Sequence, residues 1–278
     1  MMRRMLFLIL ASALLLLGAC GVAPPQVDPS PEDEELLLPA ATQVAPLPPS
    51  GVPVRILFLH HSCGANLIAQ GSVREGLASL GYEFYDHGYN GDGLVLADGT
   101  WTGENYDIPD DNTDPAGLAV LFAQSLDDPP DNAFSRLMQY DVLAYKSCYP
   151  VSLIESDEQL AETQAYYRAM RDRMDTLPDK LFLVVTHPPE IPNDTSREAA
   201  RRARALASWL VSDDFLAGHP NVATFDFFDL LADPDNDMLR REYRTSGSDA
   251  HPNERANREI GPLFVEFIDQ AVRSFTGQ

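Results

Sequence analysis

The chain has 278 residues, of which 45% are hydrophobic and 22% charged, and its formal net charge at pH 7 is -22. An acidic excess of this size disfavours binding to nucleic acid and to anionic lipid headgroups, so we expect neither as a partner. The length that remains after the N-terminal segments suits one domain with a sizeable core.

The first twenty residues have the pattern of an export signal. Two arginines precede an apolar stretch, residues 6–17, that is too short to span a bilayer comfortably. This stretch ends in Leu17-Gly18-Ala19-Cys20, which resembles a bacterial lipobox. The resemblance implies a signal peptide over residues 1–20 and a lipid on Cys20. It also implies a cell-envelope location on the outer side of the cytoplasmic membrane, or a periplasmic or extracellular one. An ordinary secretory signal with an incidental Cys20 is the alternative.

Residues 21–52 predict an extended tether. Eight of these 32 residues are Pro, five are Asp or Glu, and none is Lys or Arg. Such a segment buries too little apolar surface to offset its ordering entropy. We therefore place a single folded domain at residues 53–278.

Apolar runs alternate with amphipathic stretches in that domain, which is typical of βαβ units and a parallel sheet. The strands are expected at 54–59, 83–87, 140–147, 181–186 and 223–228, and the helices at 66–80, 118–126, 158–177, 199–210 and 260–275. Residues 88–133 form a long excursion, and such loops are usually functional or poorly ordered. The predicted fold is a three-layer α/β/α sandwich with a five-stranded parallel sheet in the order 2-1-3-4-5.

Ligands of such sheets bind beyond the carboxyl ends of the strands, so reactive residues that follow a strand are candidates. The first strand leads into His60-His61-Ser62-Cys63-Gly64. There the hydroxyl of Ser62 could attack an acyl carbon while nearby backbone N–H groups hold the oxyanion. Serine is also a common N-cap, so this segment alone leaves both interpretations open.

A second polar segment, Ser248-Asp249-Ala250-His251-Pro252-Asn253, precedes the last predicted helix. A His between Asp and Pro in a polar loop has no evident packing role. It predicts a general base, His251, oriented by Asp249, because a serine hydroxyl is a poor nucleophile without one. A surface loop with a helix start at Pro252 is the alternative.

Together the two segments resemble the SGNH/GDSL hydrolase superfamily. Its nucleophile follows the first strand, and its His lies in an Asp-x-x-His-Pro segment before the last helix. Thr186-His187-Pro188-Pro189 is similar to a Thr-x-Pro-Pro turn often found in the family. The resemblance covers roughly residues 54–275 in element order. It implies an acyl hydrolase with Ser62 as nucleophile and His251 as base, and with no cofactor.

The chain departs from the family pattern at three places. His60-His61-Ser62 replaces Gly-Asp-Ser, and Asp249 stands two residues before His251 instead of three, so a backbone carbonyl could orient the imidazole instead. The family's Gly-x-Asn-Asp is absent, and the chain reads Lys146-Ser147-Cys148-Tyr149-Pro150 there. These segments are similar to a divergent branch of the superfamily.

The missing Asn leaves the oxyanion donor open. The candidates are the backbone N–H groups of Ser62 and Cys63, a glycine near Gly91 or Gly93, and Asn112 in the Asp-rich stretch 110–115. That stretch is equally consistent with a turn in which Asp and Asn act as local caps. A calcium loop is a further alternative, although its spacing does not match an EF-hand.

If Cys20 is lipidated, Cys63 and Cys148 remain as a pair in an oxidising compartment. Both lie just beyond the ends of neighbouring strands, which are about 4.8 Å apart. We therefore predict a disulfide between Cys63 and Cys148, with two free buried thiols as the alternative. The disulfide would exclude Cys63 as the nucleophile.

His60, His61 and His187 lie near the same strand ends, but no paired carboxylate stands at ligand spacing, so no metal is assigned. The sequence predicts an extracytoplasmic serine esterase that cleaves O-acyl or O-acetyl esters through an acyl-enzyme. Its substrate would be an acylated small molecule, glycan or lipid, and its only membrane contact would be the N-terminal lipid. The alternatives are a catalytically silent binding lipoprotein on the same scaffold and a calcium-dependent adhesion module.

Overall fold

The structure, a computed structural model, describes residues 52–112 and 114–277. The expected signal peptide, the expected lipidation site Cys20 and residues 21–51 of the expected tether lie outside this part of the chain. No helix within the described ranges is both long enough and apolar enough to cross a membrane.

Six strands form one sheet in the order β3-β2-β1-β4-β5-β6. The strands are β1 (Arg55–Leu59), β2 (Glu83–His87), β3 (Leu94–Val95), β4 (Val142–Lys146), β5 (Leu181–Val185) and β6 (Val222–Phe225). All pairs are parallel except β2 with β3, which is antiparallel. The three-layer class and the order of the five parallel strands are confirmed, and β3 corrects the strand count to six. With two residues, β3 is too short for the alternation that marks a strand in sequence.

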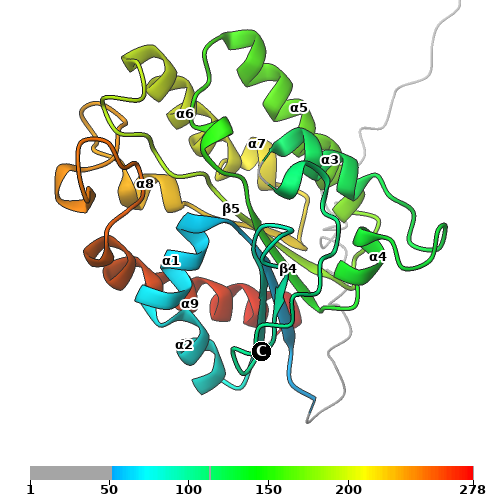
Figure 1. Ribbon diagram of the computed structural model, residues 1–278. Helices are drawn as coiled ribbons and strands as arrows, with labels where there is room; N and C mark the ends of the chain where they lie inside the picture. The colour runs from blue at the N-terminus through cyan, green and yellow to red at the C-terminus, as the bar shows by residue number, and fades with distance from the viewer. Residues whose placement is uncertain (1–51, 113, 278) are drawn as a thin grey trace, which may run out of the picture. The chain divides into compact units, whose positions relative to one another are not determined.

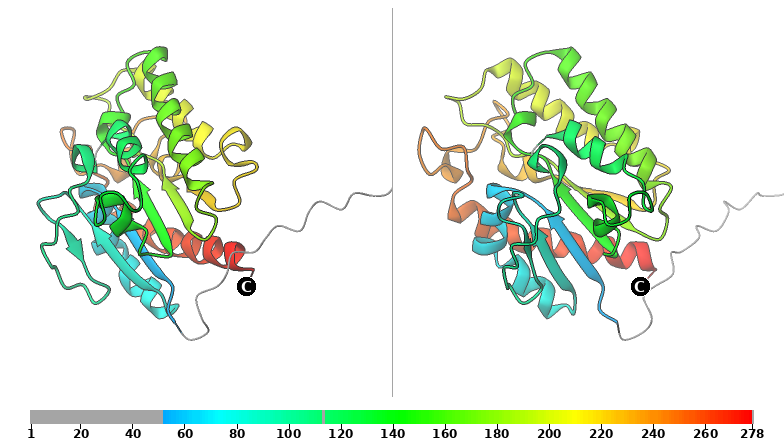
Figure 2. Two further views of the ribbon diagram at one scale, coloured as in Figure 1. Left: turned by 90° about the vertical axis from the view of Figure 1, so that its right-hand side faces the viewer. Right: turned by 45° about the vertical axis from the view of Figure 1, so that its right-hand side comes forward.

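Helices cover both faces of the sheet (Figures 1 and 2). Side chains alternate along β1, so that Leu57 and Leu59 join one core and Ile56 and Phe58 the other. The first core is closed by α3 (Pro115–Phe122), α4 (Ala133–Leu137), α5 (Asp157–Met174), α6 (Arg197–Leu210) and α7 (Asp213–Leu216). The second is closed by α1 (Ser62–Gly71), α2 (Val73–Ser79), α8 (Phe227–Leu231) and α9 (Glu254–Thr276).

The helix expected at 66–80 is two helices, α1 and α2, separated at Ser72, whose backbone is left-handed at φ 54°. Before this break, α1 crosses α9 at two glycines. A Cβ atom on Gly71 would lie 2.6 Å from the Asn257 carbonyl oxygen, and one on Gly261 would lie 2.2 Å from the Gly71 carbonyl oxygen. This crossing fixes α1, which begins at Ser62, against the helix that follows the His251 segment.

The strand expected at 223–228 ends at Phe225, because the next residues form α8. The Asp226 carboxylate caps this helix by accepting the Asp229 N–H at 3.0 Å and also accepts the Thr186 hydroxyl at 3.2 Å. Phe227 and Phe228 are buried, but they belong to helix α8 and not to a strand. A short apolar run does not distinguish the two.

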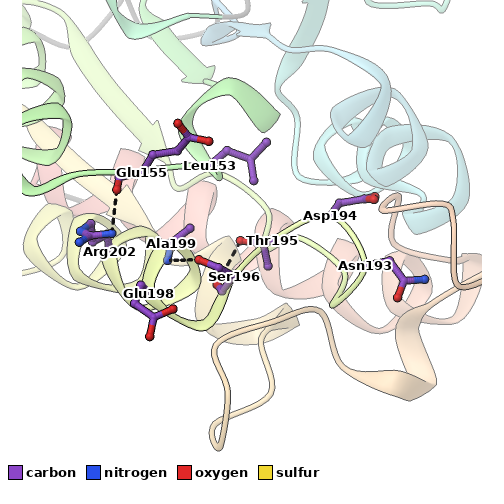
Figure 3. Close-up of a pocket in the computed structure, with 9 residues that line it drawn as sticks. All are labelled: Leu153, Glu155, Asn193, Asp194, Thr195, Ser196, Glu198, Ala199 and Arg202. Atoms are coloured by element: carbon purple, nitrogen blue, oxygen red, sulfur yellow. Dashed lines mark hydrogen bonds between the residues drawn. The ribbon is translucent and has the colours of Figure 1, made fainter.

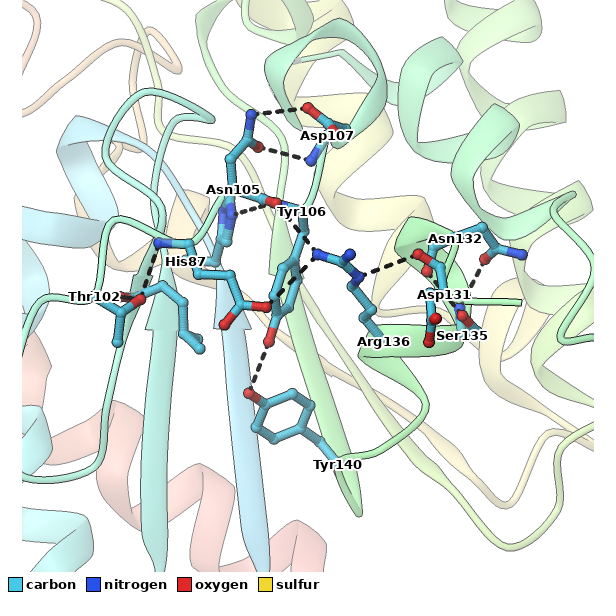
Figure 4. A network of polar contacts seen from close by, with 12 residues as sticks. His87, Thr102, Asn105, Tyr106, Asp107, Asp131, Asn132, Ser135, Arg136 and Tyr140 are labelled. Carbon is cyan, nitrogen blue, oxygen red and sulfur yellow. Dashed lines mark hydrogen bonds and ion pairs between the residues drawn. The ribbon is translucent and has the colours of Figure 1, made fainter. Parts of the chain in front are cut away.

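The excursion that begins at residue 88 carries β3, a 3-10 turn at Pro109–Asn112, and α3. Polar contacts hold part of it against the sheet (Figure 4). The Tyr106 N–H donates to His87 Nε2 at 3.3 Å, and the Tyr106 and Tyr140 hydroxyls lie 3.2 Å apart. Within its described residues, the excursion is therefore packed against β2 and against Tyr140, which precedes β4.

Candidate active site

The turn between β1 and α1 is built around His60 and Gly64. His60 is buried; its Nδ1 lies 2.9 Å from the His61 carbonyl oxygen and its Nε2 lies 3.1 Å from Asp86 Oδ2. Asp86 also pairs with Arg74 of α2. A Cβ on Gly64 would lie 2.4 Å from the His60 Cβ, closer than carbon atoms approach, so only glycine fits there. These contacts fix the first turn of α1, and Ser62 is its first residue.

The structure brings Ser62 and His251 together across 189 residues of sequence. The Ser62 Oγ lies 2.8 Å from His251 Nε2. The His251 segment is held by Asn253, whose side chain accepts the Ala256 N–H and donates to the Arg244 carbonyl oxygen. An isolated β-bridge also joins Arg244 to Pro252. These contacts fix the chain directly after His251.

Asp249 completes a hydrogen-bonded row. Its Oδ1 lies 2.7 Å from His251 Nδ1 and accepts the His251 backbone N–H at 2.9 Å. A carboxylate oxygen facing Nδ1 assigns the hydrogen to Nδ1, which leaves Nε2 free to accept the Ser62 hydroxyl hydrogen. The backbone N–H and the ring of His251 lower the pKa of Asp249, which keeps its charge at neutral pH.

The start of α1 offers free backbone donors. The N–H groups of Ser62, Cys63 and Gly64 have no acceptor among the described residues, and the His61 side chain does not cap them. N–H groups in this position attract negative charge. Of the other predicted donors, the Gly93 N–H is taken by the Tyr89 carbonyl oxygen at 2.9 Å. The Asn112 side chain lies outside what the structure describes, so its proposed role stays a prediction.

Cys63 and Cys148 are both buried free thiols, so the predicted disulfide is wrong for this structure. The pair lies together as expected. The neighbouring Cys63, then the charge of Lys146 and the side chain of His61, lower the pKa of Cys148, whereas Cys148 and burial raise the pKa of Cys63. The spacing of neighbouring strands correctly predicted that the backbones of the two cysteines lie close together. It does not set the directions of the Cβ–Sγ bonds, on which a disulfide also depends.

Two further histidines, His61 and His187, are buried near the same end of the sheet. Burial lowers the pKa of His61, whose ring packs against Tyr89 with centroids 5.1 Å apart. Burial also lowers the pKa of His187 to about 3, and its ring packs on Phe228. In the described ranges, no three His, Cys, Asp or Glu side chains gather as a metal-binding group.

The Asp-rich stretch uses its carboxylates to hold the backbone. Asp111 Oδ1 accepts the Asn90 N–H, and Asp114 Oδ1 accepts the Ala116 N–H at 2.7 Å as the N-cap of α3. These contacts match the local capping alternative for this stretch. They give no support to the calcium alternative.

A cavity of about 640 Å³ lies near the His251 segment (Figure 3). One of its lining residues, Asn193, donates from Nδ2 to the Gly247 carbonyl oxygen at 2.6 Å. Gly247 stands two residues before Asp249. The lining is mainly polar and comes from Leu153, Glu155, Asn193, Asp194, Thr195, Ser196, Glu198, Ala199 and Arg202.

Sequence reasoning assigned no role to two further residues near this site. The hydroxyl of Tyr149 lies 3.2 Å from Cys63 Sγ and donates to the Ala250 carbonyl oxygen at 2.6 Å. Glu190 is only 6% exposed, and burial, then the charge of Asp194, raises its pKa to about 7. The available signal was their position, since each follows a strand of the sheet within a few residues.

Comparisons with known proteins give a likeness of fold. No family model and no curated protein matches the sequence. A protein named as an acylhydrolase from Bacteroides fragilis is similar with a TM-score of 0.50 and 13% identity, over 79% of this chain and 88% of that one. A GDSL-like lipase from Bacteroides thetaiotaomicron follows with a TM-score of 0.47 and 10% identity, over 78% and 88%. The catalytic domain of a Streptococcus pneumoniae peptidoglycan O-acetyltransferase has a TM-score of 0.46 and 10% identity, over 82% and 97%.

Proposed function

We propose that this protein is a serine esterase of the SGNH/GDSL type that hydrolyses O-acyl or O-acetyl esters. The observation that carries the proposal is the row Ser62–His251–Asp249, with contacts of 2.8 and 2.7 Å. A hydroxyl, an imidazole and a carboxylate in this order are the parts that nucleophilic acyl transfer needs. The fold shared with the Bacteroides fragilis protein named as an acylhydrolase supports the assignment.

In the first half of the reaction, Ser62 Oγ forms a bond to the ester carbonyl carbon while His251 Nε2 takes the hydroxyl proton. Asp249 stabilises the imidazolium that results. The free N–H groups of Ser62 and Cys63 are the donors for the oxyanion. The bond to the alcohol then breaks, and His251 returns the proton to the leaving oxygen. The product is an acyl-enzyme on Ser62.

In the second half, His251 takes a proton from water, and the water oxygen attacks the acyl carbon. The bond to Ser62 Oγ breaks, the proton passes from His251 to the serine oxygen, and a carboxylic acid leaves. This cycle draws only on water and on the groups named here. The substrate class that the sequence predicted, an acylated small molecule, glycan or lipid, stays part of the proposal.

The location is also a proposal. It rests on the export pattern and the Leu17-Gly18-Ala19-Cys20 sequence, and it places the enzyme at the cell envelope through a lipid on Cys20. The test is incorporation of a labelled fatty acid into the full chain, which we expect in the natural sequence and not in Cys20→Ala. Equal labelling of both chains would contradict the anchor without touching the chemistry of Ser62.

A fluorophosphonate probe, combined with hydrolysis of 4-nitrophenyl acetate, tests the chemistry. We expect the probe to label Ser62, and Ser62→Ala to lose both labelling and hydrolysis. The matched control is Ser79→Ala on the exposed surface of α2, which should keep both activities. A folded protein with no labelling and no hydrolysis would instead favour the silent binding lipoprotein.

A further inference from the structure

We propose that Tyr149 is a positioning residue, which sets the contact between His251 and Ser62 by bridging the two segments that carry them. This inference rests on the proposed esterase function and adds a part to it. Tyr149 stands in the Lys-Ser-Cys-Tyr-Pro segment, where the resemblance would lead one to expect an asparagine. It begins a 3-10 turn, Tyr149–Val151, shortly after β4.

Two polar contacts of one hydroxyl make the bridge. The Tyr149 hydroxyl donates to the carbonyl oxygen of Ala250, the residue directly before His251, at 2.6 Å. The same oxygen lies 3.2 Å from the Sγ of Cys63, the residue directly after Ser62. These partners are 101 and 86 residues away in sequence. The Tyr149 side chain therefore connects α1, which carries Ser62, to the loop that carries His251.

The aromatic ring of Tyr149 adds a third contact. It meets the His251 ring edge to face, with centroids 5.7 Å apart and planes at 83°. This arrangement is favourable for two aromatic rings and limits sideways motion of the imidazole. Asp249 holds the same imidazole through Nδ1, so Tyr149 and Asp249 together determine where Nε2 points.

The number of hydrogens on the Tyr149 hydroxyl distinguishes a positioning role from direct contact with the reacting atoms. A tyrosine hydroxyl has one hydrogen, and that of Tyr149 goes to Ala250. The contact with Cys63 then uses the tyrosine oxygen as acceptor of the thiol hydrogen. Tyr149 has no hydrogen left for a substrate oxyanion, so it does not replace the family's asparagine. Burial raises the pKa of Tyr149 far above its usual range, which keeps the hydroxyl a donor.

The turn that carries Tyr149 is itself anchored. The Val151 N–H donates to the Cys148 carbonyl oxygen at 3.0 Å, and the Ser152 N–H donates to the Tyr149 carbonyl oxygen at 2.9 Å. The buried Ser152 hydroxyl donates to the Pro188 carbonyl oxygen at 2.5 Å, which links the turn to the segment after β5. Tyr149 is therefore a fixed point against which the His251 loop is held.

The test compares Tyr149→Phe with Tyr82→Phe. Both changes remove a hydroxyl that bonds a distant segment, because the Tyr82 hydroxyl donates to Asp269 Oδ1 at 2.7 Å. Tyr82 precedes β2, at the edge of the sheet opposite Ser62. We expect Tyr149→Phe to lower kcat for 4-nitrophenyl acetate by about 10- to 100-fold, since small misplacements of reacting groups have effects of this size. KM should stay within about threefold, and the rate of fluorophosphonate labelling should fall in proportion to kcat.

Tyr82→Phe should keep kcat and the labelling rate. A cysteine variant, Cys63→Ala, keeps the bond from Tyr149 to Ala250 and should lose less activity than Tyr149→Phe. The inference is overturned if Tyr149→Phe keeps kcat within twofold, if its loss is entirely in KM, or if Tyr82→Phe loses as much. If the unaltered protein is not labelled at Ser62, the esterase proposal has failed instead, so the two failures are distinct.

Discussion

A single oxygen of Asp249 accepts two hydrogen bonds from His251, one from the ring Nδ1 at 2.7 Å and one from the backbone N–H at 2.9 Å. The carboxylate therefore fixes both the tautomer and the direction of the imidazole, although it stands two residues before the histidine. The backbone carbonyl that the sequence left open as an orienting group is not needed in this geometry.

Replacement of Asp249 by Asn tests this relationship. The amide lacks the charge that stabilises an imidazolium, so we expect kcat for 4-nitrophenyl acetate to fall by about 10²- to 10⁴-fold with little change in KM. Steady-state kinetics give both constants. Asp235→Asn, an exposed change on another loop, is the control and should keep full activity. Activity above half of the original in Asp249→Asn would show that another group orients His251.

Gly64→Ala should disturb the nucleophile turn. The added methyl would lie 2.4 Å from the His60 Cβ, so the backbone beside Ser62 has to move. We expect both a lower melting temperature and a loss of fluorophosphonate labelling. Gly91→Ala is the matched control, because its methyl would meet no atom within 4 Å. Unchanged labelling in a folded Gly64→Ala would mean that the turn tolerates a shift.

Gly261→Ala tests the crossing of α1 and α9. Its methyl would lie 2.2 Å from the Gly71 carbonyl oxygen, which is backbone and has no rotamer to escape into. We expect a loss of about 1 to 3 kcal/mol in the free energy of unfolding, the usual range for overpacking. Urea denaturation measures it, with Ser274→Ala on the exposed face of α9 as control. A free energy of unfolding equal to that of Ser274→Ala would show that α1 and α9 do not approach each other closely at Gly261.

Glu190 predicts a pH dependence of stability. Burial raises its pKa from 4.5 to about 7 in the folded chain, so between these values the folded state holds a proton that the unfolded state has lost. Stability from this group therefore falls as pH rises from about 4.5 to 7. Glu190→Gln should remove this dependence and stabilise the protein at pH 8.

Urea unfolding at pH 5 and pH 8 measures the effect of Glu190→Gln, and Glu198→Gln provides an exposed control nearby. The buried His187 acts in the opposite sense. Burial lowers the pKa of His187 to about 3. Below about pH 6.5 the unfolded state therefore gains a proton on this residue that the folded state does not, and the free energy of unfolding decreases as pH falls. The difference in the free energy of unfolding between Glu190→Gln and the unaltered chain isolates the contribution of the Glu190 carboxyl group. No difference in slope between the two would contradict a raised pKa for Glu190.

The sequence was sufficient to predict the parallel part of the sheet and the meeting of Ser62 with His251. Continuous apolar runs such as 181–186 mark buried strands, and carboxyl ends of parallel strands share one edge. Ser62 was expected at that edge because it follows the first strand, and its meeting with His251 was expected from the resemblance to the SGNH/GDSL superfamily. The roles of the two residues still depend on the experiments above.

Other features depend on three-dimensional detail that a linear pattern lacks. The break at Ser72 rests on one left-handed residue inside an otherwise helical pattern, and β3 on two backbone pairs. Strand spacing correctly placed Cys63 and Cys148 close together, but the disulfide predicted between them is absent from the described residues. The bridge by Tyr149 joins segments about a hundred residues apart through a hydroxyl, and no periodicity reports such a contact.

The direction of β1 has a practical consequence. Arg55 begins this strand, and Ser62 follows its other end, so five residues at about 3.3 Å each separate the entry of the chain from the reacting groups. A reporter protein or an affinity tag fused before residue 52 would join the domain on the side away from Ser62. Immobilisation through that end should therefore leave bulky polymeric esters free to approach the catalyst.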